Sequence, residues 1–264
     1  MNEMATSTGI IIIATLAVSF VGLMGGVLLI IKEQFTRRWS AYFVSFAAGS
    51  ILGATFLNLL PEAFDKGADK TRDIIMAIFI GILVFFILEK LLVWHHHAHE
   101  DETHVHTRIY SHNLATARPL IIVGDALHNL LDGAIIAIAF MTDTTLGLIT
   151  SAAVIAHEIP QEIGDFSILI SSGMAKARVL IWNIAGALIA VLGALIVIIA
   201  RETFENVEVP ILGFVIGNFI YIALADLLPT IQHERKLTNT LNQIFLIFAG
   251  IGVIWLLGTI LPHE

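Results

Sequence analysis

The sequence predicts an all-α integral membrane protein, and three observations lead to this fold class. Hydrophobic residues make up 57% of the 264 residues and charged residues only 14%. The mean hydropathy is strongly positive, at +0.86. Apolar segments recur along the whole chain with the length of about 20 residues that a helix needs to cross a hydrocarbon core of about 30 Å. A water-soluble globular protein does not have this composition.

Eight apolar segments are long enough to cross a bilayer as helices. They are residues 8–31, 40–61, 73–94, 114–141, 145–172, 178–200, 208–230 and 241–262. Almost no chain is left for a soluble domain, so we expect one transmembrane domain over residues 1–264. The first segment is preceded by Glu3 and by no Lys or Arg, so the basic start of a cleavable signal peptide is missing and we expect this helix to be retained.

Basic residues are distributed unevenly between the two sides of the predicted bundle. Ten of the fourteen lie in or beside the loops after the first, third, fifth and seventh helices: Lys32, Arg37, Arg38, Lys90, Arg108, Arg118, Lys176, Arg178, Arg235 and Lys236. Because loops rich in Lys and Arg stay in the cytoplasm, we expect both chain termini outside, in a plasma membrane or an inner membrane.

The one sizeable predicted loop, residues 95–113, is rich in histidine and acidic residues. Its candidate metal ligands are His95, His96, His97, His99, His104 and His106. Imidazoles at this density are typical of labile metal binding, and a solvated polar linker is the alternative. On the cytoplasmic side, the loop would capture or sense ions that arrive inside.

Two predicted helices carry polar residues at helical spacing. They are Asp125, His128, Asn129 and Asp132 in the fourth helix, and His157, Glu158, Gln161, Glu162 and Asp165 in the fifth. Offsets of three, four and seven place such residues on one side of a helix, so the two polar stripes should face each other. Unpaired charges in a bilayer cost several kcal/mol each, and no Lys or Arg lies at comparable depth. The expected counter-charge is a metal ion or a proton.

The residue types favour a divalent transition metal. Imidazole suits zinc, iron, nickel and copper, while carboxylate and amide oxygens extend the range to manganese. The chain has no cysteine, so only nitrogen and oxygen ligands are available. Pro160 has no amide hydrogen, so the carbonyl of Ala156 loses its helical partner, and free backbone at membrane depth is tolerated where it lines a cavity or path.

The two stripes contain a pair of family motifs. HNLLDG at 128–133, followed by HEIPQEIGD at 157–165, resembles the paired signatures of the ZIP family of metal transporters, especially the branch whose second motif reads HEIPHEIGD. LLPEA at 59–63, LEKLL at 88–92 and GNFIYIALADLLP at 217–229 support the resemblance.

The resemblance implies that zinc or another divalent metal is the substrate and is moved into the cytoplasm through a binuclear centre. The implied ligands are His128, Asn129, Asp132, His157, Glu158 and Gln161, to which the second stripe adds Glu162. Gln161 stands where that branch has a second histidine. Occupancy of the second metal position and the choice between zinc, iron, manganese and cadmium therefore stay open.

A short internal similarity predicts an inverted repeat. NLLPEA starts at Asn58 near the end of the second helix, and DLLPTI starts at Asp226 near the end of the seventh. Because these helices should run in opposite directions, the pattern relates helices one to three with helices six to eight around helices four and five. The expected path runs from Asn58 at the outer mouth past His128 and His157 to Asp125, Asp165 and Asp226.

Three functions are compatible with the sequence. The first is a transporter that works by alternating access or an elevator-like movement of helices four and five. A metal sensor that binds without moving ions is the second. An intramembrane metalloprotease is the third, but HEIPQ lacks the second His of such a site, so we expect no enzyme. The expected partners are divalent metal ions and lipid, not nucleic acid; a homodimer is compatible with this fold.

Overall fold

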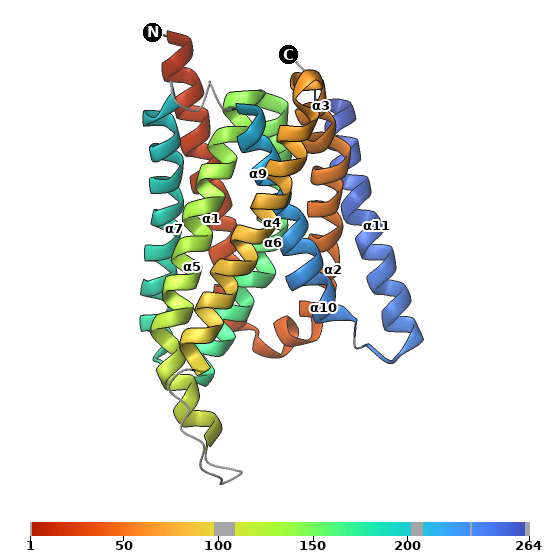
Figure 1. Ribbon diagram of the computed structural model, residues 1–264. Helices are drawn as coiled ribbons and strands as arrows, with labels where there is room; N and C mark the ends of the chain where they lie inside the picture. The colour runs from red at the N-terminus through yellow and green to blue at the C-terminus, as the bar shows by residue number, and fades with distance from the viewer. Residues whose placement is uncertain (1, 98–108, 202–207, 233, 262–264) are drawn as a thin grey trace.

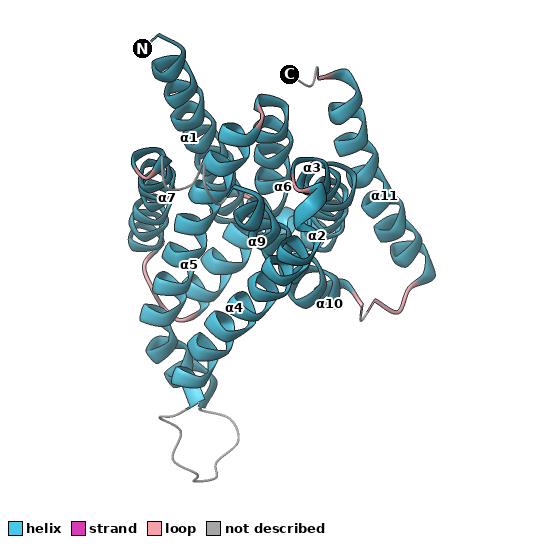
Figure 2. Ribbon diagram, turned by 45° about the horizontal axis from the view of Figure 1, so that its top comes forward, coloured by secondary structure: helices cyan, strands magenta, loops and turns pink. Residues whose placement is uncertain are grey.

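The computed structural model describes residues 2–97, 109–201, 208–232 and 234–261, and these residues form helices and short connections only (Figures 1 and 2). The elements are α1 (Asn2–Ile31), α2 (Glu33–Ala54), η1 (Thr55–Leu59), α3 (Leu60–Lys66), η2 (Ala68–Lys70), α4 (Thr71–His97), α5 (Ile109–Thr142), α6 (Thr144–Ser171), α7 (Lys176–Ile199), α9 (Glu208–Tyr221), η3 (Ile222–Leu227), α10 (Leu228–Ile231) and α11 (Leu237–Ile260). The predicted all-α membrane fold is confirmed.

Seven segments of the described chain are long and apolar enough to cross a membrane. The predicted fifth span, α6, is absent from that set because its His and carboxylate residues lower its apolar content. Its 28 residues still extend about 42 Å, more than the thickness of a hydrocarbon core. Because α6 packs against α1, α2 and α5 within the bundle, the structure is consistent with eight passes. The start of α1 and the end of α11 lie at the same end of the bundle (Figure 1).

Several helices extend beyond the predicted spans. The second pass starts at Glu33 and continues through η1 and α3 to Lys66, rather than covering 40–61. α4 continues to His97 and α5 starts at Ile109, so both helices extend into the predicted loop 95–113. His95, His96 and His97 therefore belong to a helix, while His99, His104 and His106 lie outside the described residues. Polar residues can extend a helix past the apolar core, which hydropathy alone does not detect.

The helices pack as two matching sets of pairs. α1 lies along α6 and α7 lies along α5, while α2 lies along α11 and α9 lies along α4. In the predicted repeat, α1 corresponds to α7, α2 to α9, α4 to α11, and α5 to α6. The pair α1–α6 then corresponds to α7–α5, and the pair α2–α11 corresponds to α9–α4. This is the pattern that an inverted repeat requires. α7 and α11 lie at opposite edges of the bundle (Figure 2).

Close backbone contacts recur at corresponding places in the two halves. A Cβ atom on the glycine would lie 2.0 to 2.5 Å from a backbone carbonyl oxygen in four contacts: Gly49 with Ile247, Gly217 with Ile78, Gly250 with Phe46, and Gly81 with Phe214. The first two contacts are counterparts, and so are the last two. These helices approach so closely because the glycines carry no side chain.

Both halves also contain a π-helical segment before a Leu-Leu-Pro sequence. In η1 the amide of Leu60 donates to the carbonyl of Thr55, and in η3 the amide of Leu228 donates to that of Ala223. Each hydrogen bond spans five residues instead of four. Asn58 lies in η1 and the corresponding Asp226 lies in η3. π-Helical turns are rare and occur frequently at functional sites, so both positions become candidates for function.

Candidate metal centre

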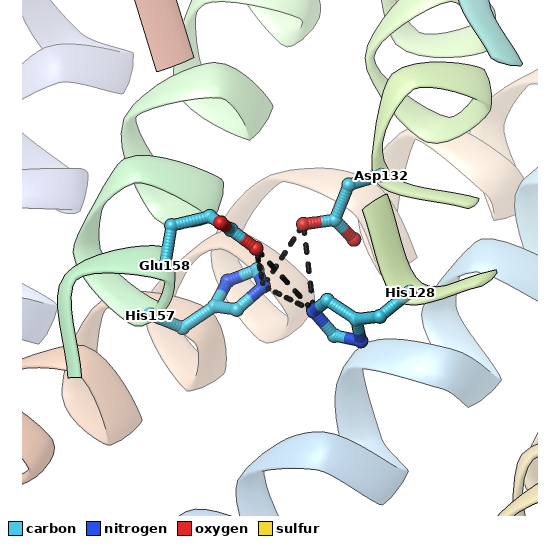
Figure 3. Close-up of side chains that lie close together, drawn as sticks. All are labelled: His128, Asp132, His157 and Glu158. Atoms are coloured by element: carbon cyan, nitrogen blue, oxygen red, sulfur yellow. Dashed lines mark hydrogen bonds and ion pairs between the residues drawn. The ribbon is translucent and has the colours of Figure 1, made fainter. Parts of the chain in front are cut away.

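Four side chains from two helices converge in the bundle interior. His128 and Asp132 project from α5 and His157 and Glu158 from α6, with their ends directed at one another (Figure 3). One ligand atom from each lies within 4.8 Å of every other. His128 Nε2 is 3.3 Å from His157 Nε2, 3.5 Å from Glu158 Oε1 and 3.6 Å from Asp132 Oδ2. Asp132 Oδ2 is 3.1 Å from His157 Nε2.

These separations fit a tetrahedral metal site. Ligands about 2.0–2.1 Å from a zinc ion at tetrahedral angles are about 3.3 Å from one another. Four of the pairs given above lie between 3.1 and 3.6 Å. The fifth, His157 Nε2 to Glu158 Oε1, is longer at 3.9 Å. Two imidazoles and two carboxylates form a donor set that suits zinc and neighbouring transition metals.

The orientation of His157 is fixed by its own helix. Its Nδ1 atom is 3.2 Å from the carbonyl oxygen of Ala153, one turn earlier. A carbonyl can only accept a hydrogen bond, so Nδ1 carries the hydrogen and Nε2 presents its lone pair to the centre. On another side, the ring meets Phe219 of α9 edge-on, with centroids 6.4 Å apart. The site therefore has the backbone support typical of a histidine ligand.

The centre is buried and contains carboxylate oxygens without hydrogen-bond partners. The side chains of Asp132 and Glu158 are each 4% exposed, that of His157 is 1% exposed and that of His128 is 16% exposed. Asp132 Oδ1 and Glu158 Oε1 are fully buried and accept no hydrogen bond. Buried polar atoms are nearly always paired, so these orphans call for a cation. The residues present thus fit a divalent metal.

The other predicted ligands have different environments. The amide nitrogen of Asn129 donates to the backbone oxygen and the carboxylate of Asp125, at 3.1 and 2.8 Å. Glu162 is one turn beyond Glu158, is 2% exposed and has a carboxylate oxygen without a hydrogen-bond partner. Gln161 is partly buried on the same helix. The four-residue group therefore includes His128, Asp132, His157 and Glu158 of the seven predicted ligands.

The predicted path residues include a series of neighbouring carboxyl groups. Glu162 interacts electrostatically with Asp125 and Asp165, and Asp165 interacts with Asp125 and Asp226. Asp125 is buried and Asp226 is exposed, so the series leads from the interior to a surface. Asn58, in the other π segment, is partly buried, and its amide nitrogen has no hydrogen-bond partner.

Two glycines that shape the site were not identified as functional from the sequence. A Cβ on Gly22 of α1 would lie 3.1 Å from both Cβ and Oε2 of Glu158. A Cβ on Gly186 of α7 would lie 2.6 Å from Oδ2 of Asp125. Glycine in an apolar helix has packing as its ordinary interpretation, so no sequence signal pointed to these contacts.

Comparison with known families places the motifs in context. A family profile described as "ZIP Zinc transporter" matches residues 8–119 and 94–258, which together cover nearly the whole chain and include both ligand-bearing helices. The chain belongs to the ZIP zinc transporter family. The family predicted from HNLLDG and HEIPQEIGD is therefore confirmed, while the branch suggested by the second motif stays a prediction.

Individual members of the family are similar over most of this chain. The zinc transporter ZIP13 of Pongo abelii is 30% identical over 223 residues, which cover 80% of this chain and 64% of that protein. The zinc transporter YKE4 of Saccharomyces cerevisiae is 30% identical over 241 residues, covering 81% and 69%. The human zinc transporter ZIP6 is 37% identical over 137 residues, which are 50% of this chain and 18% of that protein. This chain thus spans about two thirds of the ZIP13 and YKE4 relatives and a small part of ZIP6.

Proposed function

We propose that this protein moves a divalent transition metal, with zinc the foremost substrate, across a membrane into the cytoplasm. The observation that carries the proposal is the buried group of His128, Asp132, His157 and Glu158, which has tetrahedral spacing in the interior of a membrane bundle. The relatives named zinc transporters support zinc as the substrate.

The surroundings of the centre favour transport over static storage. Glu162, Asp125, Asp165 and Asp226 continue a series of carboxyl groups from the centre to an exposed position. Repeated weak oxygen sites let an ion leave a centre of two imidazoles and two carboxylates in steps, each smaller than complete release into water. We infer that metal passes from the outer mouth at Asn58 through the centre and along these carboxylates, and that the histidines of residues 95–113 receive it.

The bundle architecture supports an alternating-access mechanism. α5 and α6 carry all four ligands, and each packs along a helix from the opposite half of the repeat. The pairs α2–α11 and α9–α4 are joined by close glycine contacts, which suit a rigid frame. We propose that α5 and α6, together with α1 and α7, move the centre relative to this frame.

The two rival functions differ in what the centre must do. A hydrolytic zinc site keeps one coordination position open for water, whereas four protein ligands here fill a tetrahedron, so a protease is disfavoured. A metal sensor would use the same four ligands, and only a flux measurement separates it from a transporter.

The test is metal uptake into proteoliposomes that contain a fluorescent chelator. Zinc, iron(II), manganese and cadmium are compared with the wild-type chain, the double variant His128→Ala/His157→Ala, and Gly164→Ala. Gly164 is the control because a Cβ there would meet nothing within 4 Å. We expect flux for wild type and Gly164→Ala that is lost in the double variant. Metal binding without flux at any gradient would instead favour the sensor.

A further inference from the structure

A side-chain clamp joins α5 and α6 at the end of the bundle where α5 begins and α6 ends. Arg118 of α5 donates from Nε to the hydroxyl of Ser172 at 2.8 Å and from Nη2 to the carbonyl oxygen of Ser172. The hydroxyl of Ser172 in turn donates to the carbonyl of Leu169 at 2.6 Å. One guanidinium thus holds both the side chain and the backbone of the residue that caps α6.

The end of α6 is built to receive this cation. Gly173 has a positive φ of 87°, and its amide donates to the carbonyl of Ile170, while the amide of Met174 donates to that of Leu169. These two hydrogen bonds define a Schellman cap, which ends a helix sharply and keeps its last carbonyl groups close together at the helix end. The negative end of the helix dipole therefore faces Arg118. A side chain at position 173 would also lie 3.3 Å from the guanidinium, so glycine keeps the space open.

The clamp lies on the same line as the metal centre. Asp125 follows Arg118 by seven residues and Asp132 by fourteen, while Asp165 precedes Ser172 by seven residues and Glu158 by fourteen. Seven residues are about two helical turns, or about 10 Å, so each set returns to nearly the same helix face. Because α5 and α6 are antiparallel neighbours, the three pairs occupy three successive levels of one seam between the two helices. We define the seam by these six residues.

The charges along the seam change sign at its end. The level at the metal centre consists of Asp132 with Glu158, and the next level consists of Asp125 with Asp165. The third level presents the fixed positive charge of Arg118. A cation that follows the carboxylates away from the centre therefore meets a hydrogen-bonded guanidinium about 10 Å beyond Asp125. An intact contact at this level would oppose, by its bulk and its charge, any cation that moves along the seam beyond Asp125 and Asp165.

We propose that Arg118 and Ser172 form a latch that closes the inner end of the seam and must separate before metal leaves. The latch deepens the proposed transport function and rests on it. In this role Arg118 is a positioning residue: it acts on the metal through the spacing of α5 and α6 and through its charge, not as a ligand.

The experiment uses the natural absence of cysteine to report opening. Leu169, next to the clamp, is 1% exposed, and Val154, in the outer half of α6, is 0% exposed. Each is changed to cysteine in a separate background of the full chain, and the rate of reaction with a cationic, membrane-impermeant thiol reagent is measured. Each background is compared with and without Arg118→Gln.

Loss of the latch should raise the reaction rate of Leu169→Cys about tenfold, since a hydrogen bond to a charged group usually shifts an equilibrium by that order. The rate of Val154→Cys should not change. Arg118→Lys should restore part of the protection, because an ammonium keeps the charge without the two-pronged geometry. Arg178→Gln, which removes an exposed charge on α7 nearby in the sequence, is the matched control and should change neither rate.

An unchanged rate for Leu169→Cys in Arg118→Gln would overturn the latch. So would an equal rise at Leu169→Cys and Val154→Cys, because that result means general loosening of α6. In flux assays, Arg118→Gln should change the maximal rate at least fivefold with less than a twofold change in KM, since the latch acts after binding. If the wild-type chain carries no flux, the transport proposal fails, while the labelling rates still decide whether the clamp closes the seam.

Discussion

Gly22 provides a direct test of the proposed metal centre because it lies beside the proposed ligand Glu158 and offers no ligand atom of its own. In the variant Gly22→Ala, the added methyl group would lie 3.1 Å from Cβ and from Oε2 of Glu158. Ordinary van der Waals contact begins near 3.4 Å, so Glu158 and its part of α6 must retreat by about 0.3 Å.

A displacement of this size matters at a metal site. Ligand distances at such sites hold to within about 0.2 Å, so a retreat of about 0.3 Å weakens the bond from Glu158. Disturbing the support of a ligand typically lowers metal affinity about 10- to 100-fold, or about 1.4–2.7 kcal/mol. The fold should survive, because alanine is a better helix former than glycine and the contact involves a carboxylate side chain.

The assay is competition for zinc between the purified protein and a fluorescent chelator, with thermal unfolding measured in parallel. Gly164→Ala is the matched control, since it adds the same methyl group to α6 and meets nothing within 4 Å. Wild-type zinc affinity in Gly22→Ala would refute the placement of Glu158 in the first coordination sphere. A loss of affinity that accompanies a large fall in the unfolding midpoint would assign the effect to stability instead.

Three further predictions concern the repeat, the path and the α10–α11 connection. Gly49→Ala and Gly217→Ala should each destabilise the protein by about 1–3 kcal/mol, because the new Cβ atoms would lie 2.0 and 2.2 Å from carbonyl oxygens. Gly252→Ala should have no such effect, because a Cβ there meets nothing within 4 Å. Unfolding in denaturant measures the loss of stability, and unequal losses for Gly49→Ala and Gly217→Ala would contradict equivalent halves. Asp226→Asn should lower the maximal zinc flux several-fold with little change in KM, since one carboxylate of the inner path is lost; a pure KM effect in the flux assay would place Asp226 at the outer mouth. The pKa of Glu234 is lowered because its carboxylate accepts hydrogen bonds from the backbone amide of Lys236, the side chain of Asn239 and the backbone amide of Arg235. The stabilisation from these contacts is present at neutral pH and is lost as the pH falls through the lowered pKa. An NMR titration midpoint at or above the ordinary 4.5 would contradict these contacts.

The polar stripes of α5 and α6 could be predicted from the sequence because charged residues in an apolar segment are conspicuous. His128 and Asp132 are one turn apart, as are His157 and Gln161, so helical spacing predicts two facing stripes. It cannot choose among neighbours within a stripe, which depends on the rotation of α5 against α6. In the structure, Glu158 points toward His128, Asp132 and His157, while Asn129 donates a hydrogen bond to Asp125. Gln161 and Glu162 lie a turn further along α6, and their part in a second metal position stays a prediction.

Other features had no sequence signal of their own. Arg118 contributed to the predicted orientation only as one of many basic residues, because the partner that gives it a role is a serine 54 positions away. The contacts of Gly49 and Gly250 depend on which helices pair, and hydropathy does not contain that information. By contrast, the similarity of NLLPEA and DLLPTI did indicate the repeat. Asn58 and Asp226 each precede a Leu-Leu-Pro sequence, and each lies in a π-helical turn of the structure.

The two π-helical turns bear on the rates of the proposed transport cycle but not on its net direction. They share one backbone geometry in the two halves of the repeat, and they differ in carrying a neutral amide at Asn58 and a carboxyl group at Asp226. On the proposed path, with Asn58 at the outer mouth and Asp226 toward the inner one, this difference would alter how long an ion stays at each mouth and hence the speed in each direction at a given concentration. It cannot alter the ratio of forward to backward rates at equilibrium, because both mouths belong to one closed cycle. Unless a second ion is coupled to the cycle, net movement through this frame reverses whenever the metal gradient and membrane potential reverse.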